Sequence, residues 1–245
     1  MGVTRLSVII LATSTDHHAE RAIASVLKQA DPIGTEVILI DPSPDQRTQT
    51  YLKSRFAKDV ELETLRFLSV PATSNAARLR NEGARFARGG FLAFLDPQDE
   101  WLYGRLIELW PIIEEFDLIL SPRPDYSGSK DWLREFLRRN QGSGSAAVVR
   151  RSLFEAACGF RESSFLLGET DYEFWLKCLG MLERAGRRKR FMALPAHNIK
   201  VAARETGTHR RMREAVSIAR VCPKLPRRYW GAAVRYSLSR FISHT

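Results

Sequence analysis

Short apolar runs alternate with helix-like segments over the first 120 residues of the chain. The apolar runs cover residues 6–11, 36–40, 66–70, 91–95 and 118–120. Between the first two runs, apolar side chains recur three and four residues apart after a candidate N-cap at Asp16, which predicts an amphipathic helix. Strands that alternate with helices of this length predict an α/β fold, a doubly wound and mostly parallel sheet with helices on both faces.

The pattern changes after residue 121, where Ser121-Pro122-Arg123-Pro124 interrupts it. A Gly- and Ser-rich segment at 141–145 predicts a flexible loop. A short strand at 146–150, a helix at 152–158 and a helix from Thr170 to about residue 182 are expected next. Residues 207–241 predict two helices separated near Pro223 and Pro226. We therefore divide the chain into an α/β domain, residues 1–205, and a helical extension, residues 206–245.

Acidic side chains follow two of the predicted strands. Asp41 ends the second run, and Asp96 and Asp99 follow the fourth. In an open α/β sheet, ligands bind outside the carboxyl ends of the strands, where carboxylates can bind a cation or a sugar hydroxyl. Local roles stay open as alternatives: Asp41 can hold its own loop, and Asp99 and Glu100 can cap a helix that starts near Trp101.

Several sequence blocks resemble the family 2 glycosyltransferases, which have the GT-A fold. The blocks stand in the order that the family uses and cover most of residues 5–200: Ala22-Ile23-Ala24-Ser25-Val26-Leu27-Lys28-Gln29, Glu36-Val37-Ile38-Leu39-Ile40-Asp41, Arg80-Asn81-x-Gly83 with Ala87-Arg88-Gly89 and Phe91-Leu92-Ala93-Phe94-Leu95-Asp96, Val148 to Phe160, and Gly168 to Leu176.

The resemblance implies an inverting transfer of a sugar from a nucleotide-diphosphate donor to a hydroxyl acceptor. It implies that Asp171 is the general base and that Asp41, Arg80, Asp96 and Trp175 bind substrate. It also implies that a D-x-D motif binds Mg²⁺ or Mn²⁺, and in this chain the metal-binding positions are Asp96, Gln98 and Asp99.

Two positions depart from the family pattern. Pro42 replaces a carboxylate after the second strand, and neutral Gln98 replaces the last acid of the D-x-D motif. Because a Gln carbonyl lacks the charge that draws in a divalent cation, we expect metal binding to be weakened or absent. Arg204 is a candidate to offset the diphosphate charge instead. The alternative hypothesis is a catalytically degenerate GT-A domain that binds a ligand or a partner.

The charge is concentrated at the C-terminal end. Residues 184–245 contain 16 Lys and Arg but only 2 Asp and Glu, whereas residues 1–183 contain 22 and 26. In this basic segment, Lys and Arg alternate with aromatic residues such as Tyr229 and Trp230. The excess of positive charge and these aromatic residues predict an anionic partner such as a membrane surface or a lipid-linked acceptor. Nucleic acid is disfavoured because no recognised binding motif accompanies the charge.

The cysteine count and the lengths of the apolar runs predict where the protein resides. The three cysteines are odd in number and lack metal-ligand spacing, which favours reduced thiols. No apolar run approaches the roughly 20 residues that span a bilayer. We therefore expect a cytoplasmic protein that can lie peripherally at the inner face of the membrane.

Overall fold

A seven-stranded sheet forms the centre of the protein in the computed structural model, which describes residues 5–12, 16–71, 75–121, 131–138, 144–162, 170–187, 190–194, 198–201 and 208–242. The strand order is β3-β2-β1-β4-β7-β6-β8. The strands are β1 (Leu6–Leu11), β2 (Thr35–Asp41), β3 (Leu65–Ser69), β4 (Phe91–Leu95), β6 (Leu118–Leu120), β7 (Val148–Arg150) and β8 (Phe191–Ala193).

The predicted mostly parallel sheet is confirmed. Strands β3, β2, β1 and β4 pair in parallel, and β6 pairs in parallel with β8. Only β7 runs against its neighbours β4 and β6. All six residues of β1 are buried, as expected for a central strand that helices cover on both faces.

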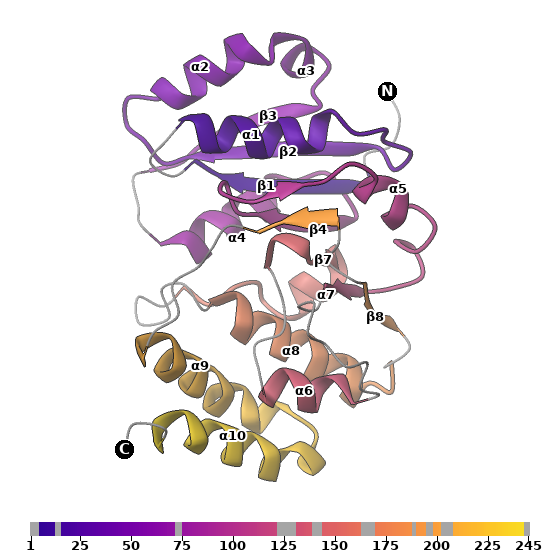
Figure 1. Ribbon diagram of the computed structural model, residues 1–245, viewed down its shortest axis with the longest axis vertical. Helices are drawn as coiled ribbons and strands as arrows, with labels where there is room; N and C mark the ends of the chain where they lie inside the picture. The colour runs from indigo at the N-terminus through magenta and orange to yellow at the C-terminus, as the bar shows by residue number, and fades with distance from the viewer. Residues whose placement is uncertain are drawn as a thin grey trace.

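Helices cover both faces of the sheet (Figure 1). The described helices are α1 (Asp16–Leu27), α2 (Arg47–Arg55), α3 (Ala57–Glu61), α4 (Ala76–Phe86), α5 (Arg105–Leu109), α6 (Trp132–Arg138), α7 (Arg151–Ala156), α8 (Thr170–Arg184), α9 (Thr208–Val221) and α10 (Trp230–Ile242). One core cluster joins the sheet to α1, α2 and α5. The other joins the opposite face to α4, α6, α7 and α8.

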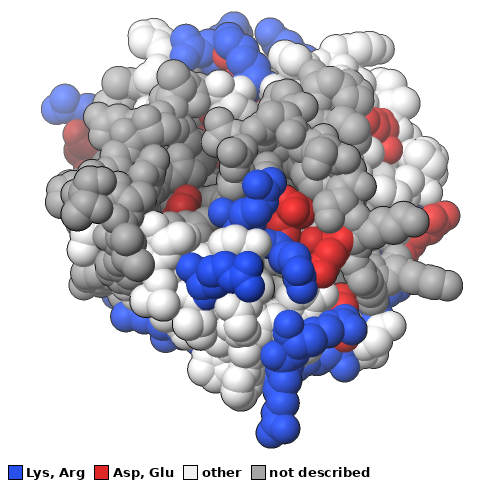
Figure 2. Space-filling view, turned by 60° about the horizontal axis from the view of Figure 1, so that its bottom comes forward, with Lys and Arg blue, Asp and Glu red and all other residues white. Residues whose placement is uncertain are grey.

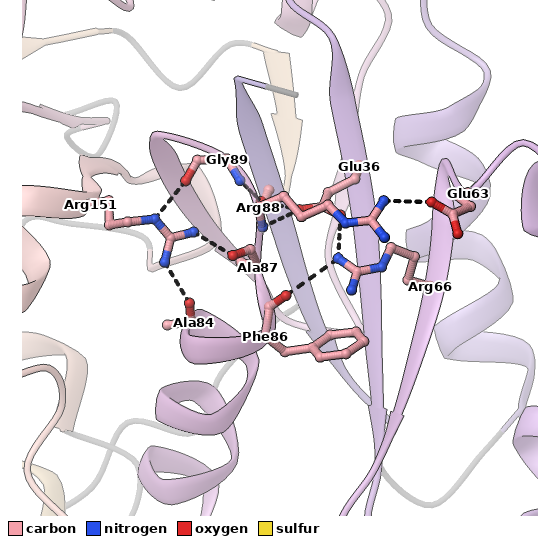
Figure 3. Close-up of polar contacts among 10 residues, drawn as sticks. Glu36, Glu63, Arg66, Ala84, Phe86, Ala87, Arg88, Gly89 and Arg151 are labelled. Carbon is pink, nitrogen blue, oxygen red and sulfur yellow. Dashed lines mark hydrogen bonds and ion pairs between the residues drawn. The ribbon is translucent and has the colours of Figure 1, made fainter. Parts of the chain in front are cut away.

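A buried polar network closes the amino-terminal edge of the sheet (Figure 3). Glu36 is 2% exposed and accepts hydrogen bonds from Ser7 Oγ (2.6 Å) and Arg88 N (2.7 Å). Its second oxygen pairs with Arg66 (2.8 Å). Arg151 donates three hydrogen bonds of 2.8 Å to the carbonyls at the end of α4 and in the turn that follows, those of Ala84, Ala87 and Gly89. The Ala-Arg-Gly block is thus a structural turn.

Two further parts of the family-like blocks have packing roles. A Cβ atom on Gly83 would lie 2.5 Å from Ile40 and 2.7 Å from Ile9, so only glycine lets α4 approach the sheet this closely. Asn81 exchanges hydrogen bonds of 2.9 Å with the backbone N–H and C=O of Phe160. Asn81 therefore ties α4 to the segment after α7.

The C-terminal segment forms two helices, α9 and α10, as predicted. Short 3₁₀ turns, η5 (Cys222–Lys224) and η6 (Arg227–Tyr229), separate them at the two prolines. Ile218, Val221 and Leu225 join the same core cluster as α8, so this segment packs onto the rest of the protein. The domain boundary at residue 205 falls in 202–207, outside the described residues, and stays a prediction.

Three local predictions need correction. The helix expected near Trp101 starts at Arg105, because Glu100–Trp101 forms a short strand, β5, that pairs with β9 (Ile199–Lys200). The end of the predicted flexible loop is an ordered 3₁₀ turn, η1 (Gly144–Ala146). The strand after it starts at Val148 and not at residue 146.

Candidate functional site

The carboxyl edge of the sheet brings together the acids that follow β2 and β4. Leu11 pairs with Ile40, and Ile10 pairs with Leu95. Asp41 and Asp96 therefore lie on either side of the end of β1, at the same edge of the sheet. This is the edge at which open α/β sheets bind ligands.

One carboxylate oxygen of Asp41 holds its own loop, and the other has no hydrogen-bond donor in the described part of the chain. The residue is 2% exposed, and its Oδ1 atom accepts hydrogen bonds from the backbone N–H and the hydroxyl of Ser43. Its Oδ2 atom is buried and has no hydrogen-bond partner among the described residues. Because an unpaired buried carboxylate oxygen is costly, this atom is a candidate acceptor for a ligand donor group.

The loop after β4 is a tight turn built around Asp96. Its Oδ1 atom accepts the backbone N–H of Gln98 (3.1 Å), and its carbonyl oxygen accepts that of Asp99 (2.9 Å). Its own N–H donates to Ser145 Oγ (3.0 Å), which in turn donates to the carboxylate of Asp99. Ser145 therefore fixes both ends of the loop.

The D-x-D positions do not fit a strong divalent cation site. Asp99 is 0% exposed, and its carboxylate is bonded to Ser145, whereas Gln98 is exposed and neutral. In the described part of the chain, no group of three or more His, Cys, Asp or Glu side chains has the spacing of a metal site. Of the three positions proposed for metal, Asp96 alone offers a half-exposed carboxylate.

Two side chains from the neighbouring β5–α5 segment hold η1 in place. The indole Nε1 of Trp101 donates to the carbonyl of Ser145 (2.8 Å), and Arg105 donates to that of Ala146 (2.7 Å). Arg105 is 0% exposed, and burial lowers its pKa to about 10. The guanidinium is still charged at neutral pH, so the bond to Ala146 is a buried charge-assisted hydrogen bond.

The candidate base meets the same turn from the other side. Asp171 lies in the first turn of α8 and is partly exposed. Its Oδ2 atom is 2.9 Å from the position that a Cβ on Gly144 would take, and its Oδ1 atom accepts the N–H of Tyr172. The η1 turn thus lies beside Asp171 at Gly144 and is hydrogen-bonded to the Asp96 loop through Ser145.

The remaining predicted substrate-binding residues lie elsewhere. Arg80 and Trp175 both contact the ring of Phe160: the Arg80 Cζ atom is 5.7 Å from its centroid, and the Trp175 ring centroid is 6.2 Å from it. Trp175 is 1% exposed, a degree of burial that does not favour substrate contact. Arg204 lies outside the described residues. The substrate roles of all three stay predictions.

Sequence reasoning missed the residues that assemble this site. Ser145 and Gly144 belong to a segment whose composition indicates a mobile linker. Trp101 and Arg105 lie far from this segment along the chain, in the stretch where the sequence predicts the start of a helix. The available signal was a short apolar strand immediately after the Gly-Ser segment, since a linker that enters a buried strand must be anchored at that end.

Comparison with known proteins agrees with this architecture. Residues 7–171 match the sequence family described as "Glycosyl transferase family 2". No curated protein matches the chain in sequence. Among solved structures, residues 1–349 of TarS from S. aureus align with a TM-score of 0.70 at 16% identity, covering 99% of this chain and 73% of that one.

A second structural neighbour comes from a different organism. It is the mannosyltransferase PcManGT from Pyrobaculum calidifontis, solved with GDP-Man and Mn²⁺. Its TM-score is 0.71 at 17% identity, over 98% of this chain and 74% of that one. TarS has also been solved with UDP-GlcNAc. At these identities the likeness shows the GT-A fold, and the family match, which spans more than half of the chain, shows the membership: this protein belongs to glycosyl transferase family 2.

Proposed function

We propose that the protein is an inverting glycosyltransferase that moves a sugar from a nucleotide-diphosphate donor to a hydroxyl acceptor. The observation that carries the proposal is the η1 turn, which lies beside Asp171 at Gly144 and is hydrogen-bonded to the Asp96 loop through Ser145. Nucleotide sugars are bound by the structural neighbours TarS and PcManGT, which supports this class of donor.

The chemistry assigned to this chain centres on Asp171. Its carboxylate accepts the proton of the acceptor hydroxyl as the hydroxyl oxygen attacks the anomeric carbon. The bond from that carbon to the diphosphate breaks at the same time, and the nucleoside diphosphate leaves with the bonding electrons. Attack from the face opposite the leaving group inverts the anomeric carbon. Asp41 and Asp96 bind the donor at the carboxyl edge.

Metal dependence is expected to be weak. A divalent cation would supply charge to the leaving diphosphate, but the residues at the D-x-D positions offer it one half-exposed carboxylate. Arg204 is proposed to offset part of the diphosphate charge.

Binding and turnover can be tested separately. A thermal-shift screen of nucleotide sugars, with and without Mn²⁺, should find at least one donor that raises the melting temperature, because a ligand that binds only the folded state stabilises it. With that donor, Asp171→Asn should abolish transfer and leave the shift in melting temperature nearly unchanged, as expected for a group that acts in the transition state. Transfer that survives in this variant excludes Asp171 as the base.

A catalytically degenerate domain is the second candidate. Pro42 and Gln98 favour it, because each removes a carboxylate from the donor side. It predicts donor binding without transfer or hydrolysis in the unsubstituted protein. If no nucleotide sugar binds even at millimolar concentration, the domain instead binds another ligand or a partner.

We also propose that the protein lies peripherally on an anionic membrane at its cytoplasmic face, where a lipid-linked acceptor is found. Trp230, Val234 and Leu238 follow one another every four residues on α10 and are 41–53% exposed. Arg227 and Arg235, just before and within α10, are exposed, and so is Arg228, which pairs with Glu183. An exposed apolar helix face beside basic side chains is typical of a helix that lies in the membrane interface. In the described part of the chain, no helix has the length and apolarity of a membrane span.

Sedimentation with liposomes tests the membrane proposal. Binding to anionic vesicles should exceed binding to neutral ones and weaken as salt rises. Val234→Ser with Leu238→Gln should lower binding, whereas Leu62→Gln, which replaces an exposed leucine before β3, should not. Equal binding to neutral vesicles contradicts the proposal.

A further inference from the structure

A pocket of about 540 Å³ lies on the helical side of the protein, away from the candidate active site. It is formed by α4, the segment after α7, α8 and η5, and none of the acids at the carboxyl edge lines it. Its volume is in the range of small-molecule sites. The lower end of the molecule, where α8, α9 and α10 lie, carries a group of Lys and Arg side chains near the middle of the face in Figure 2.

The charge of the pocket wall is strongly positive. Five cationic side chains line it, from Arg85, Arg161, Lys177, Arg184 and Lys224, against one carboxylate from Glu162. Two of the five have acidic partners: Arg85 pairs with Glu82 (2.6 Å), and Arg161 pairs with Glu173 (2.6 Å). The positive charge of the other three is not balanced in this way.

Lys177, Arg184 and Lys224 form no ion pair with any carboxylate in the described part of the chain. Lys177 donates to the carbonyl of Gly159 (3.0 Å), and Arg184 donates to those of Pro223 and Leu225 (2.8 and 2.9 Å). Carbonyl oxygens orient these cations without neutralising them. Burial lowers the pKa of Lys177, and an anion bound beside its ammonium group would favour the charged form.

We propose that this pocket is a second ligand site, which binds a phosphate group. The positive charge comes from four parts of the chain, α4, the segment after α7, α8 and η5, and converges on one concave surface. Guanidinium and ammonium groups are the side chains that bind phosphate with charge-assisted hydrogen bonds. The site is independent of the proposed sugar transfer, and its ligand is either a soluble phosphate compound or the phosphate headgroup of a lipid.

The pocket contains its own reporter, the exposed thiol of Cys158. Cys178 is fully buried, and burial raises its pKa far above the usual value, so it does not compete for a thiol reagent. Cys222→Ser removes the remaining partly exposed thiol. The alkylation rate of Cys158 in this background measures occupancy of the pocket.

Inorganic phosphate should slow alkylation of Cys158 relative to chloride at equal ionic strength. Lys177→Gln with Lys224→Gln should raise the half-protecting phosphate concentration by about tenfold. Lys58→Gln, which replaces an exposed lysine outside the pocket, should leave it unchanged. Because Lys224 is exposed, the single variant Lys224→Gln tests the site without a risk to folding.

The choice of probe distinguishes a soluble phosphate compound from a lipid headgroup. Protection by glycerol 3-phosphate supports a soluble ligand, and protection by phosphatidic acid vesicles alone supports a lipid headgroup. Equal rates with phosphate, chloride and vesicles overturn the proposal. Asp171→Asn protein should keep full protection, so a failed sugar transfer and a failed phosphate site give different results.

Discussion

The Oδ2 atom of Asp171 lies 2.9 Å from the position that a Cβ atom on Gly144 would occupy. A methyl group at residue 144 therefore requires the carboxylate to move. The displaced group is the free end of a side chain and not backbone, so the fold can accommodate the change. The position of the proposed base is what the change disturbs.

We predict that Gly144→Ala lowers kcat/KM by about 100-fold, because catalysis is sensitive to displacements of about 1 Å. The free energy of unfolding should change by less than about 1 kcal/mol. Steady-state kinetics and urea denaturation check the two expectations. Gly90→Ala is a matched control, since a Cβ there meets no atom within 4 Å. Unchanged kcat/KM in Gly144→Ala contradicts the assigned role of Asp171.

Gln98→Asp should strengthen Mn²⁺ binding. The substitution puts a second carboxylate on an exposed position of the Asp96 loop, and hard cations prefer charged oxygen ligands. We expect the dissociation constant for Mn²⁺ to fall by about tenfold, measured by titration calorimetry. The same substitution in an Asp96→Asn background should show little gain, because the partner carboxylate is missing. Equal gains in both backgrounds place the metal elsewhere.

Removing the Glu36 side chain should destabilise the fold strongly. Glu36→Ala leaves Arg66, Ser7 and the Arg88 N–H without their shared partner at a buried position (Figure 3). Breaking a buried ion pair costs about 3–5 kcal/mol, which urea denaturation can measure. Glu63→Gln is the control, because it breaks the exposed pair between Glu63 and Arg88 and should have little effect.

The lowered pKa of Asp117 predicts that the free energy of unfolding decreases in acid. Burial opposes its ionisation, but hydrogen bonds from Arg190 and Arg150 and the charge of Arg187 outweigh burial and lower its pKa below the ordinary value of 3.8. A carboxyl group with a lowered pKa in the folded state stabilises the protein above its unfolded-state pKa. That stability is lost as the pH falls through the folded-state pKa.

The prediction is checked with Asp117→Asn. The variant should be less stable than the unsubstituted protein at pH 7, and its free energy of unfolding should fall less steeply below about pH 4. Urea denaturation across that range gives both quantities. Asp45→Asn, at an exposed pair with Arg47, serves as the comparison. Parallel curves for Asp117→Asn and the unsubstituted protein contradict the assignment.

The strands were predictable and the turn that joins the acids was not, for a physical reason. Residues 6–11 and 91–95 are buried on both faces, so all their positions except Ser7 are apolar and the pattern is unambiguous. The η1 turn is held by contacts from residues far away along the chain, Trp101 and Arg105. The amino-acid composition of residues 141–145 does not indicate such long-range contacts. Pattern reasoning therefore placed Asp96 at the edge but gave Asp99 an open role, whereas its carboxylate is fully buried.

The three-residue η1 turn has a consequence for how the proposed activity can change. In the proposed reaction, Gly144 lies beside Asp171 on the acceptor side, and Ser145 holds the loop of Asp96 on the donor side. A substitution that shifts the turn would then alter both halves of the proposed reaction at once. New donor or acceptor preferences are therefore more readily evolved through residues that contact only one half, such as Ser43 beside Asp41, than through the turn itself.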